Sequence, residues 1–409
     1  MFKNIFLIGI VVIIIAIFAA DKIPDITPTP VDPVSIEPTF VAHPIKLQDG
    51  TTFEFQAPET YAITPAAEGL KRIRFMAWSP DRRLFLTDMY DLTDNTKGKI
   101  YILDTFDEAT GTFASTTTYL SNLRNPNSVA FYEDQEGKNW IYIALTDKLL
   151  RYKYSAGDTK PQSPAETIAT FPAYGLSYKY GGWHLTRTIV IHENKLYISV
   201  GSSCNSCEEK EPERASIIQM NPDGSESRFF AKGLRNAVGM EWVNDELFAT
   251  NMGSDHLGKD VPNEMMYRIR PGTHYGWPYC YVHKGLVSED SSTPWIRNNV
   301  SCAVVPAADV EFPAHSAPLG LRYFTPSFED QYLRDSFLVA LHGSGDVKIG
   351  TGYKIVKVTR DTGKVTDFIS GFLSDSTRNG RPVDILQYNN SSFFFTDDYK
   401  GVLYFVSLK

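Results

Sequence analysis

The chain repeats one strand pattern six times along most of its 409 residues, and this repetition limits the folds that it can adopt. Each repeat reads as an apolar strand, a turn, a second apolar strand that ends in polar residues, and a third strand. The repeats begin near Arg74, Asn127, Arg187, Val238, Leu319 and Arg381. A single antiparallel sheet with two apolar faces cannot bury both of them alone, so the repeats must pack on one another.

Six such sheets bury both faces when they are arranged radially around one axis, because each sheet then packs on its two neighbours. We therefore predict an all-β six-bladed β-propeller over residues 51–409. The 28 glycines, 24 prolines and 13% aromatic residues agree with short strands joined by tight turns. A seven-bladed propeller and a two-sheet sandwich are the alternatives. An excess segment between the fourth and fifth repeats, residues 272–317, is expected to lie over one face of the disc as an insertion.

The amino terminus carries an apolar stretch from Ile5 to Ala20. We interpret residues 1–21 as a cleaved signal peptide or a retained membrane anchor, since the stretch is long for the first and short for the second. Residues 22–50 are rich in proline and are expected to form an extended linker. Both readings place the protein outside the cytoplasm, in the periplasm or the extracellular space, with membrane contact only through this segment.

Four cysteines in an exported chain predict two disulfides. Of the three possible connectivities, we predict the two local pairs, Cys204 with Cys207 and Cys280 with Cys302. The alternative is a zinc site formed by the two pairs together.

The net charge of −8 and the absence of a basic run argue against a nucleic-acid partner, because affinity for nucleic acid rests mainly on clustered lysine and arginine. A propeller instead brings the ends of its inner strands to one central pocket, where function is expected. Those ends carry an imidazole, several cations and small polar groups, and among them are His184, Arg235, Asn236, Gly253, Ser254, Asp255, His342 and Arg381. This mixture suits a planar cofactor with several carboxylates, since each carboxylate favours charge-assisted donors.

Two stretches carry a family resemblance. The first is G-G-W-H-L-T-R around His184, and the second runs from G-L-R-N-A-V-G at Gly233 through N-M-G-S-D-H to G-W-P-Y-C-Y. Together they resemble the glucose and sorbosone dehydrogenase family, whose members are quinoproteins that use pyrroloquinoline quinone (PQQ) and calcium. The resemblance covers about residues 53–405. It implies oxidation of an aldose or a related sugar aldehyde, with the electrons passed to an exported acceptor.

The resemblance also assigns roles to residues. His184 matches the general base that takes the proton of the sugar hydroxyl, and an imidazole suits that task because its pKa lies near the working pH. Arg235 and Asn236 match the pair that hydrogen-bonds the quinone oxygens and stabilises the developing charge. Arg381 and Lys348 correspond to the cations that hold the PQQ carboxylates, with Arg378 as a further candidate.

Calcium in this family is bound partly by backbone carbonyls of the turn that matches Gly253, Ser254 and Asp255, and oxygen ligands suit this hard cation. Glu264 is expected to cap that loop or to bind a second, structural ion.

The sequence departs from the soluble glucose dehydrogenases at two places. Trp183 and Ser202 stand where those enzymes have acids beside the histidine, so we expect another neighbour to orient the imidazole. The fifth repeat has H-G-S-G-D where an aromatic residue and an arginine are expected after H-G-S, so one cofactor contact is expected to be missing. His315 and His342 are expected either at the rim without chemistry or in the pocket.

Two other functions fit the same sequence. A calcium-dependent lactonase would use a metal at the axis to activate water, and a non-catalytic propeller would display a carbohydrate-binding or protein-binding face. In those readings His184 is a satisfied polar residue at a blade junction and Arg235 is a clamp between blades.

Overall fold

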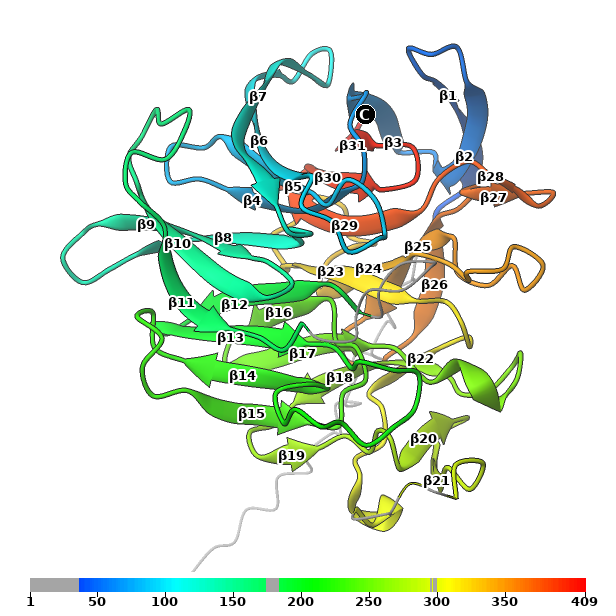
Figure 1. Ribbon diagram of the computed structural model, residues 1–409. Coiled ribbons are helices and arrows are strands. Elements are labelled where there is room, and N and C mark those ends of the chain that lie inside the picture. The colour runs from blue at the N-terminus through cyan, green and yellow to red at the C-terminus, as the bar shows by residue number, and fades with distance from the viewer. Residues whose placement is uncertain (1–36, 174–183, 295, 297–299) are drawn as a thin grey trace, which may run out of the picture. The chain divides into compact units, whose positions relative to one another are not determined.

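Six sheets surround a common axis in the computed structural model, which describes residues 37–173, 184–294, 296 and 300–409 (Figure 1). The first three blades have these strands: β4 (Ile73–Trp78), β5 (Leu84–Asp88), β6 (Gly98–Asp107) and β7 (Thr112–Leu123); β8 (Ser128–Glu133), β9 (Asn139–Ala144), β10 (Lys148–Tyr154) and β11 (Glu166–Thr170); β12 (Arg187–His192), β13 (Lys195–Val200), β14 (Ser216–Met220) and β15 (Arg228–Lys232), with β19 (Thr273–His274) added in parallel.

The other three blades complete the ring. Their strands are β16 (Met240–Val243), β17 (Glu246–Asn251), β18 (Glu264–Ile269) and β22 (Val310–Phe312); β23 (Pro318–Phe324), β24 (Ser336–Leu341), β25 (Lys354–Thr359) and β26 (Val365–Ile369); β29 (Pro382–Gln387), β30 (Ser392–Asp397), β31 (Val402–Leu408) and β3 (Tyr61–Ala67). The predicted all-β six-bladed propeller is therefore confirmed. No helix among the described residues combines the length and the apolar character needed to span a bilayer.

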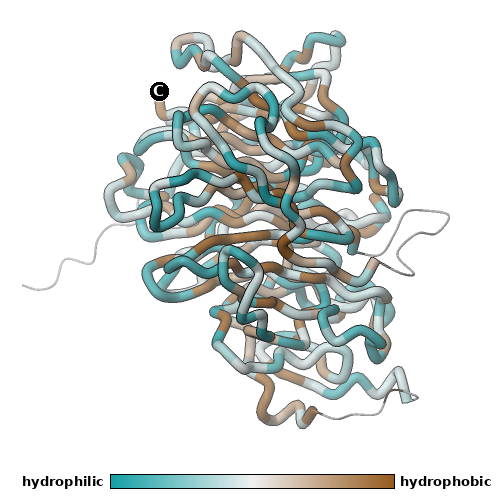
Figure 2. Tube along the Cα trace, turned by 60° about the vertical axis from the view of Figure 1, so that its left-hand side comes forward, coloured by the Kyte–Doolittle hydropathy of each residue, from teal (hydrophilic) through white to brown (hydrophobic). Residues whose placement is uncertain are grey.

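The second strand of each blade is buried on both faces. Every residue of β5 and of β24 is buried, because each sheet lies between two neighbouring sheets. The apolar strands fill the space between the blades, whereas the polar residues gather in the loops (Figure 2). The hydrophobic core thus consists of layers between adjacent blades, and the inner strands surround the axis.

The ring is closed by a strand that the sequence did not reveal. The sixth repeat supplies only β29, β30 and β31, and its outer strand is β3, which pairs antiparallel with β31 from Tyr61 opposite Leu408 to Ala67 opposite Leu403. The beginning and the end of the propeller are therefore joined in one sheet.

The predicted linker of residues 22–50 ends earlier than expected. β1 (Phe40–Lys46) and β2 (Thr52–Pro58) form a hairpin, and His43 and Ile45 of β1 are buried while their neighbours in the strand are exposed. This alternation is that of a strand with one face on the protein, so Phe40–Lys46 packs as a strand and is not part of an extended tether. The predicted signal or anchor, residues 1–21, lies outside the described residues.

The predicted insertion, residues 272–317, is partly a blade component. It contains β19, the hairpin of β20 (Cys280–His283) and β21 (Leu286–Glu289), and β22, which is the outer strand of the fourth blade. Both predicted disulfides are present, Cys204–Cys207 and Cys280–Cys302, so the four cysteines form no zinc site.

Candidate functional site

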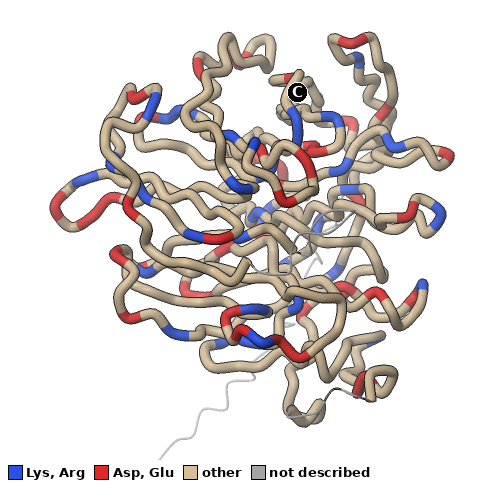
Figure 3. Tube along the Cα trace, viewed as in Figure 1, with Lys and Arg blue, Asp and Glu red and all other residues tan. Residues whose placement is uncertain are grey.

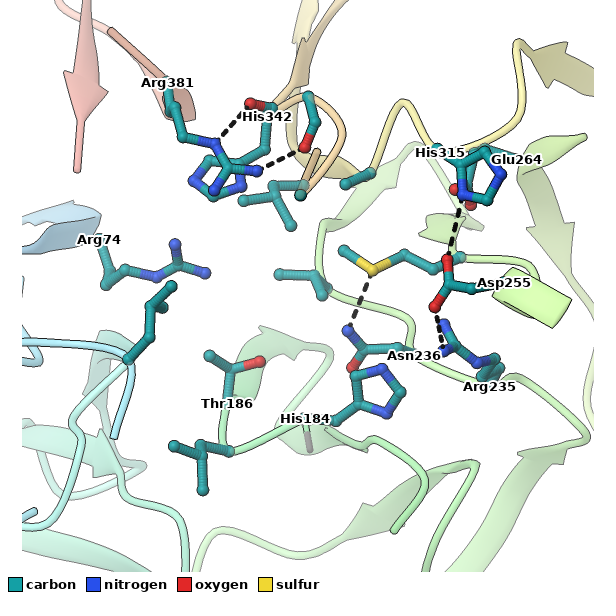
Figure 4. Close-up of a pocket in the computed structure, with 18 of the residues that line it drawn as sticks. Arg74, His184, Thr186, Arg235, Asn236, Asp255, Glu264, His315, His342 and Arg381 are labelled. Atoms are coloured by element: carbon teal, nitrogen blue, oxygen red, sulfur yellow. Dashed lines mark hydrogen bonds and ion pairs between the residues drawn. The ribbon is translucent and has the colours of Figure 1, made fainter. Parts of the chain in front are cut away.

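A cavity of about 350 Å³ lies where the inner strands of the blades begin, and we call it the hub cavity (Figure 4). Its polar lining consists of three arginines, three histidines, two carboxylates, one amide and one hydroxyl: Arg74, Arg235, Arg381, His184, His315, His342, Asp255, Glu264, Asn236 and Thr186. Six of the residues expected in the central pocket therefore lie together: His184, Arg235, Asn236, Asp255, His342 and Arg381. Gly253, Ser254 and Lys348 are not among the lining residues.

His184 precedes β12, and the contacts of its Nδ1 determine which ring nitrogen carries the hydrogen. Its Nδ1 lies 2.9 Å from Ser202 Oγ and 3.0 Å from the Ser202 carbonyl oxygen, while Ser202 Oγ donates to the Cys204 carbonyl at 2.7 Å. Because the carbonyl can only accept and the hydroxyl proton is already used, Nδ1 carries the hydrogen. The lone pair of the ring is then on Nε2, which makes Nε2 the proton acceptor.

This arrangement corrects one expectation. The sequence led us to look for another residue to orient the imidazole, because Ser202 replaces an acid, but Ser202 itself orients it through two oxygens. Trp183, the other departure, lies outside the described residues.

Arg187 fixes the short segment that carries His184. It is fully buried, and its guanidinium donates to the carbonyls of His184 at 2.8 Å, Thr186 at 2.9 Å and Pro172 at 3.2 Å. Burial and the positive charge of Arg214 lower the pKa of Arg187 to about 9, so it remains charged at neutral pH. His184 has a φ of 43°, a conformation that a non-glycine residue keeps only when its surroundings hold it.

The close packing around His184 depends on Gly201. A Cβ atom at this position would lie 2.4 Å from Asn236 Oδ1 and 2.6 Å from His184 Cβ, so only glycine fits. Burial and the positive charge of Arg235 lower the pKa of His184 well below its usual value. The imidazole is therefore neutral at physiological pH, as a base must be, but its pKa does not lie near the working pH as we had expected from the sequence.

Arg235 and Asn236 lie between β15 and β16, on the same side of the hub cavity as His184. Arg235 is 3% exposed, and its Nη2 lies 3.1 Å from Asp255 Oδ2. Asn236 Nδ2 lies 3.3 Å from the sulfur of Met252. Arg235 is thus a buried cation that pairs with the Asp255 carboxylate, and Asn236 adds a neutral donor to the lining of the same cavity.

Two carboxylates approach the cavity near Arg235. Asp255 also lies 3.2 Å from His315 Nδ1, and Glu264 accepts a hydrogen bond from the Gly253 amide at 2.7 Å. Burial and the charge of Asp255 raise the pKa of Glu264 to about 8. The carboxylate of Asp255 is thus held between Arg235 and His315, and Glu264 is held by the Gly253 amide.

The expected role of Glu264 as a loop cap agrees with its bond to Gly253, although the same side chain also lines the cavity. Of the expected calcium turn, Asp255 is the residue that lines the cavity, and Ser254 Oγ is engaged with Asn205 at 3.1 Å.

The opposite side of the cavity holds a network that the sequence did not predict. Asp398 accepts from Arg74 Nη1 at 2.8 Å and from His342 Nε2 at 2.8 Å, and Arg72 lies 3.2 Å away. Although burial opposes it, His342 and the two arginines hold the pKa of Asp398 below its usual range. Burial and the charge of Arg381 lower the pKa of His342 to about 3, so this imidazole is neutral.

Arg381 completes that side of the cavity. Its Nε donates to the His342 carbonyl at 3.0 Å, and its Nη2 donates to the Gly343 carbonyl. Lys348, in contrast, is exposed on the loop after β24, where its backbone amide donates a hydrogen bond to Asp346 Oδ1. Arg378 donates to Tyr353 Oη at 3.1 Å and to the Gly345 carbonyl. We had expected Lys348 to be the second cation on this side of the cavity. The second cation that lines the cavity here is instead Arg74 of β4.

An apolar cluster seals the cavity along the axis. It contains Phe75, Val238, Leu319 and Val383, with Met252 packed against it. Val238 and Leu319 face the hub cavity, whereas Phe75 faces a second cavity farther along the axis. Apolar side chains of this cluster therefore lie between the two cavities.

Comparisons with known proteins agree with this architecture. The family described as TrAA12-like matches residues 55–407. An uncharacterized protein of Borreliella burgdorferi is 31% identical over 302 residues, which cover 70% of this chain and 76% of that protein.

Two solved structures are similar over nearly the whole propeller. The holo form of the PQQ domain of pyranose dehydrogenase from Coprinopsis cinerea has a TM-score of 0.69 at 16% identity and covers 89% of this chain and 98% of its own. The calcium structure of the Trichoderma reesei Carbohydrate-Active Enzymes Family AA12 protein has a TM-score of 0.68 at 16% identity and covers 92% and 99%. The similarity to PQQ-dependent sugar dehydrogenases that the motifs predicted is thus confirmed, and at these identities it establishes the fold.

Proposed function

Because this chain belongs to the TrAA12-like family, we propose that it is a PQQ- and calcium-dependent dehydrogenase that oxidises an aldose or a related sugar aldehyde. The observation that carries the proposal is the convergence of an oriented imidazole and three guanidinium groups in one cavity (Figure 4). Neither a calcium-dependent lactonase nor a non-catalytic propeller requires three arginines in this cavity.

The residues present fit an anionic, planar cofactor. Arg74 and Arg381 face the cavity from one side and Arg235 from the other, which gives fixed donors for carboxylates at separate points. The volume of about 350 Å³ is within the range of roughly 300 to 1,000 Å³ that is usual for small-molecule sites. These three arginines would hold PQQ, and Asn236 would add a donor to a quinone oxygen.

His184 is the proposed base. When bound, PQQ supplies a two-electron acceptor for the hydride that leaves the sugar carbon. The task of His184 Nε2 is to accept the proton of the sugar hydroxyl at that carbon, and Ser202 keeps the ring hydrogen on Nδ1 so that the basic lone pair is on Nε2. Arg235 lines the same cavity, and its positive charge would stabilise negative charge that develops on the bound cofactor.

Calcium would be held by oxygen ligands at the acidic side of the cavity. Asp255 and Glu264 supply carboxylates, and bound calcium would keep Glu264 ionised in spite of its raised pKa. The ion would act as a Lewis acid toward the bound cofactor.

We also propose that the propeller works outside the cytoplasm and passes electrons to an exported acceptor. The apolar stretch from Ile5 to Ala20 supports export, and two disulfides are typical of an oxidising compartment.

Reconstitution tests this function. Apo-protein mixed with PQQ and calcium is expected to reduce a redox dye when an aldose from a panel of sugars is added. His184→Ala is expected to keep its affinity for PQQ and to lose turnover by about a hundredfold or more, the usual scale for removal of a general base.

His192→Ala is the matched control, because His192 lies at the far end of β12 and stacks on Trp242. It should turn over like the wild type. A dye that stays oxidised with every sugar, while PQQ and calcium are bound, would contradict the proposed activity and leave binding or hydrolysis.

A further inference from the structure

A loop of four residues, closed by the Cys204–Cys207 disulfide, contacts two groups beside the hub cavity, Ser202 and Arg235. The carbonyl of its first residue, Cys204, accepts a hydrogen bond from the Ser202 hydroxyl, and Ser202 in turn orients His184. Its second residue, Asn205, contacts Arg235. The same loop therefore touches the proposed base and the proposed charge-stabilising cation.

Asn205 binds Arg235 through two bonds. Arg235 Nε donates to the Asn205 carbonyl at 2.9 Å, and Arg235 Nη2 donates to Asn205 Oδ1 at 2.8 Å. Two parallel acceptors on one residue fix the plane of a guanidinium as well as its position. Asn205 Oδ1 also accepts from the Asp255 amide at 2.8 Å, so the carboxylate that pairs with Arg235 is placed by the same atom.

Asn205 also connects the cavity wall to the segment of residues 272–317. Its carbonyl accepts from Trp277 Nε1 at 3.2 Å and from Ser254 Oγ at 3.1 Å, and its Nδ2 lies 3.2 Å from His256 Nδ1. His256 Nε2 in turn lies 2.8 Å from Asp290 Oδ2. A half-buried asparagine with this many partners has a single geometry, and the disulfide limits the conformations of the loop that carries it.

We propose that Asn205 is a positioning residue that fixes Arg235 and Asp255 for cofactor and calcium, and that the disulfide holds it in place. The proposal rests on the proposed function for the identity of the ligand. The predicted fixing of Arg235 and Asp255 does not depend on that function, because it follows from the hydrogen bonds of Asn205 alone. Asn205 touches no reacting atom, and its effect is exerted through Arg235 and Asp255.

The test compares Asn205→Ala with Ser206→Ala. Ser206 belongs to the same disulfide loop, and its hydroxyl is buried without a hydrogen-bond partner among the described residues, so its loss should change nothing. Hydrogen exchange of the backbone amides needs no cofactor. We expect Asn205→Ala to exchange faster than wild type at residues 253–258 and unchanged at β24, whereas Ser206→Ala should match wild type at both.

Two further variants separate positioning from a general loss of stability. Asn205→Asp keeps an acceptor oxygen for the Asp255 amide and should restore slow exchange at residues 253–258. The double variant Cys204→Ser, Cys207→Ser should show the faster exchange of Asn205→Ala while it retains the asparagine.

The second readout is PQQ affinity in the presence of calcium. Asn205→Ala is expected to bind PQQ roughly tenfold more weakly, the scale of one lost hydrogen bond to a charged group. Unchanged exchange at residues 253–258, or an affinity within about twofold of wild type, would overturn the proposal. A wild-type protein that binds no PQQ would instead overturn the proposed function, and exchange would then decide the ordering role of Asn205 alone.

Discussion

At the scale of single residues, the environment of His184 differs from that of a histidine paired with a carboxylate. A neighbouring acid would raise the pKa of the ring, whereas Ser202 offers two neutral oxygens and the surrounding charges come from Arg235, Arg187 and Arg214. Burial acts in the same direction, because it opposes the charged form. The neutral imidazole is therefore the favoured form at neutral pH.

This arrangement predicts an unusual pH dependence. Protonation of Nε2 abolishes the base, and the pKa of His184 lies well below its usual value, so kcat/KM should stay constant as the pH falls from 7.5 to about 6. The measurement is the pH profile of dye reduction at saturating PQQ and calcium. A loss of half of the activity near pH 6.5 would show an ordinary histidine and would contradict the geometry.

The sequence predicted those site residues that lie in short motifs. His184 lies in G-G-W-H-L-T-R, and Arg235 and Asn236 are adjacent, so one local pattern identifies each. Arg74 and Asp398 are 324 residues apart in the chain and meet only in the closed ring, where no local pattern marks them. Asn205 is easily noticed in the sequence because it lies between two cysteines. Its role, however, depends on contacts with Arg235 and Trp277, which are distant in the chain.

At the scale of strands, the repeats predicted the blades but not the closure of the ring. β3 reads Y-A-I-T-P-A-A, which lacks the run of β-branched and aromatic residues of an inner strand and contains Pro65. A proline is tolerated there because β3 is the outer strand of its sheet and has a partner on one side only. Its partner, β31, lies at the other end of the chain, so no repeat includes it.

Tyr61 of β3 should carry much of the closure energy. It is fully buried, packs edge-on against Phe368 at 5.4 Å, and donates to Asp330 at 2.7 Å. Tyr61→Ala is expected to lower the free energy of unfolding by about 3 to 5 kcal/mol, measured by urea denaturation. Leu286→Ala, at a side chain that is 69% exposed, is the control and should change it by less than about 0.5 kcal/mol. Equal losses in the two variants would show that Tyr61 contributes little to the stability of the closed ring.

At the scale of the whole molecule, net charge and local charge have opposite signs. The chain carries −8, and acidic and basic residues mix along the peripheral loops (Figure 3), yet three arginines gather at the hub. Composition therefore could not reveal a site for a small anion. The fold creates that site, because it brings Arg74, Arg235 and Arg381 from three different blades or blade junctions to one axis.

The central claim is that the hub cavity binds an anionic quinone, and an equilibrium titration with PQQ tests it most directly. Followed by quenching of tryptophan fluorescence with calcium present, the wild type should bind about one equivalent, and Arg381→Ala should bind at least about tenfold more weakly because a charge-assisted contact is lost. Lys348→Ala, which removes an exposed cation outside the cavity, should bind like the wild type. No saturable binding by the wild type, or equal weakening in the two variants, would contradict the account.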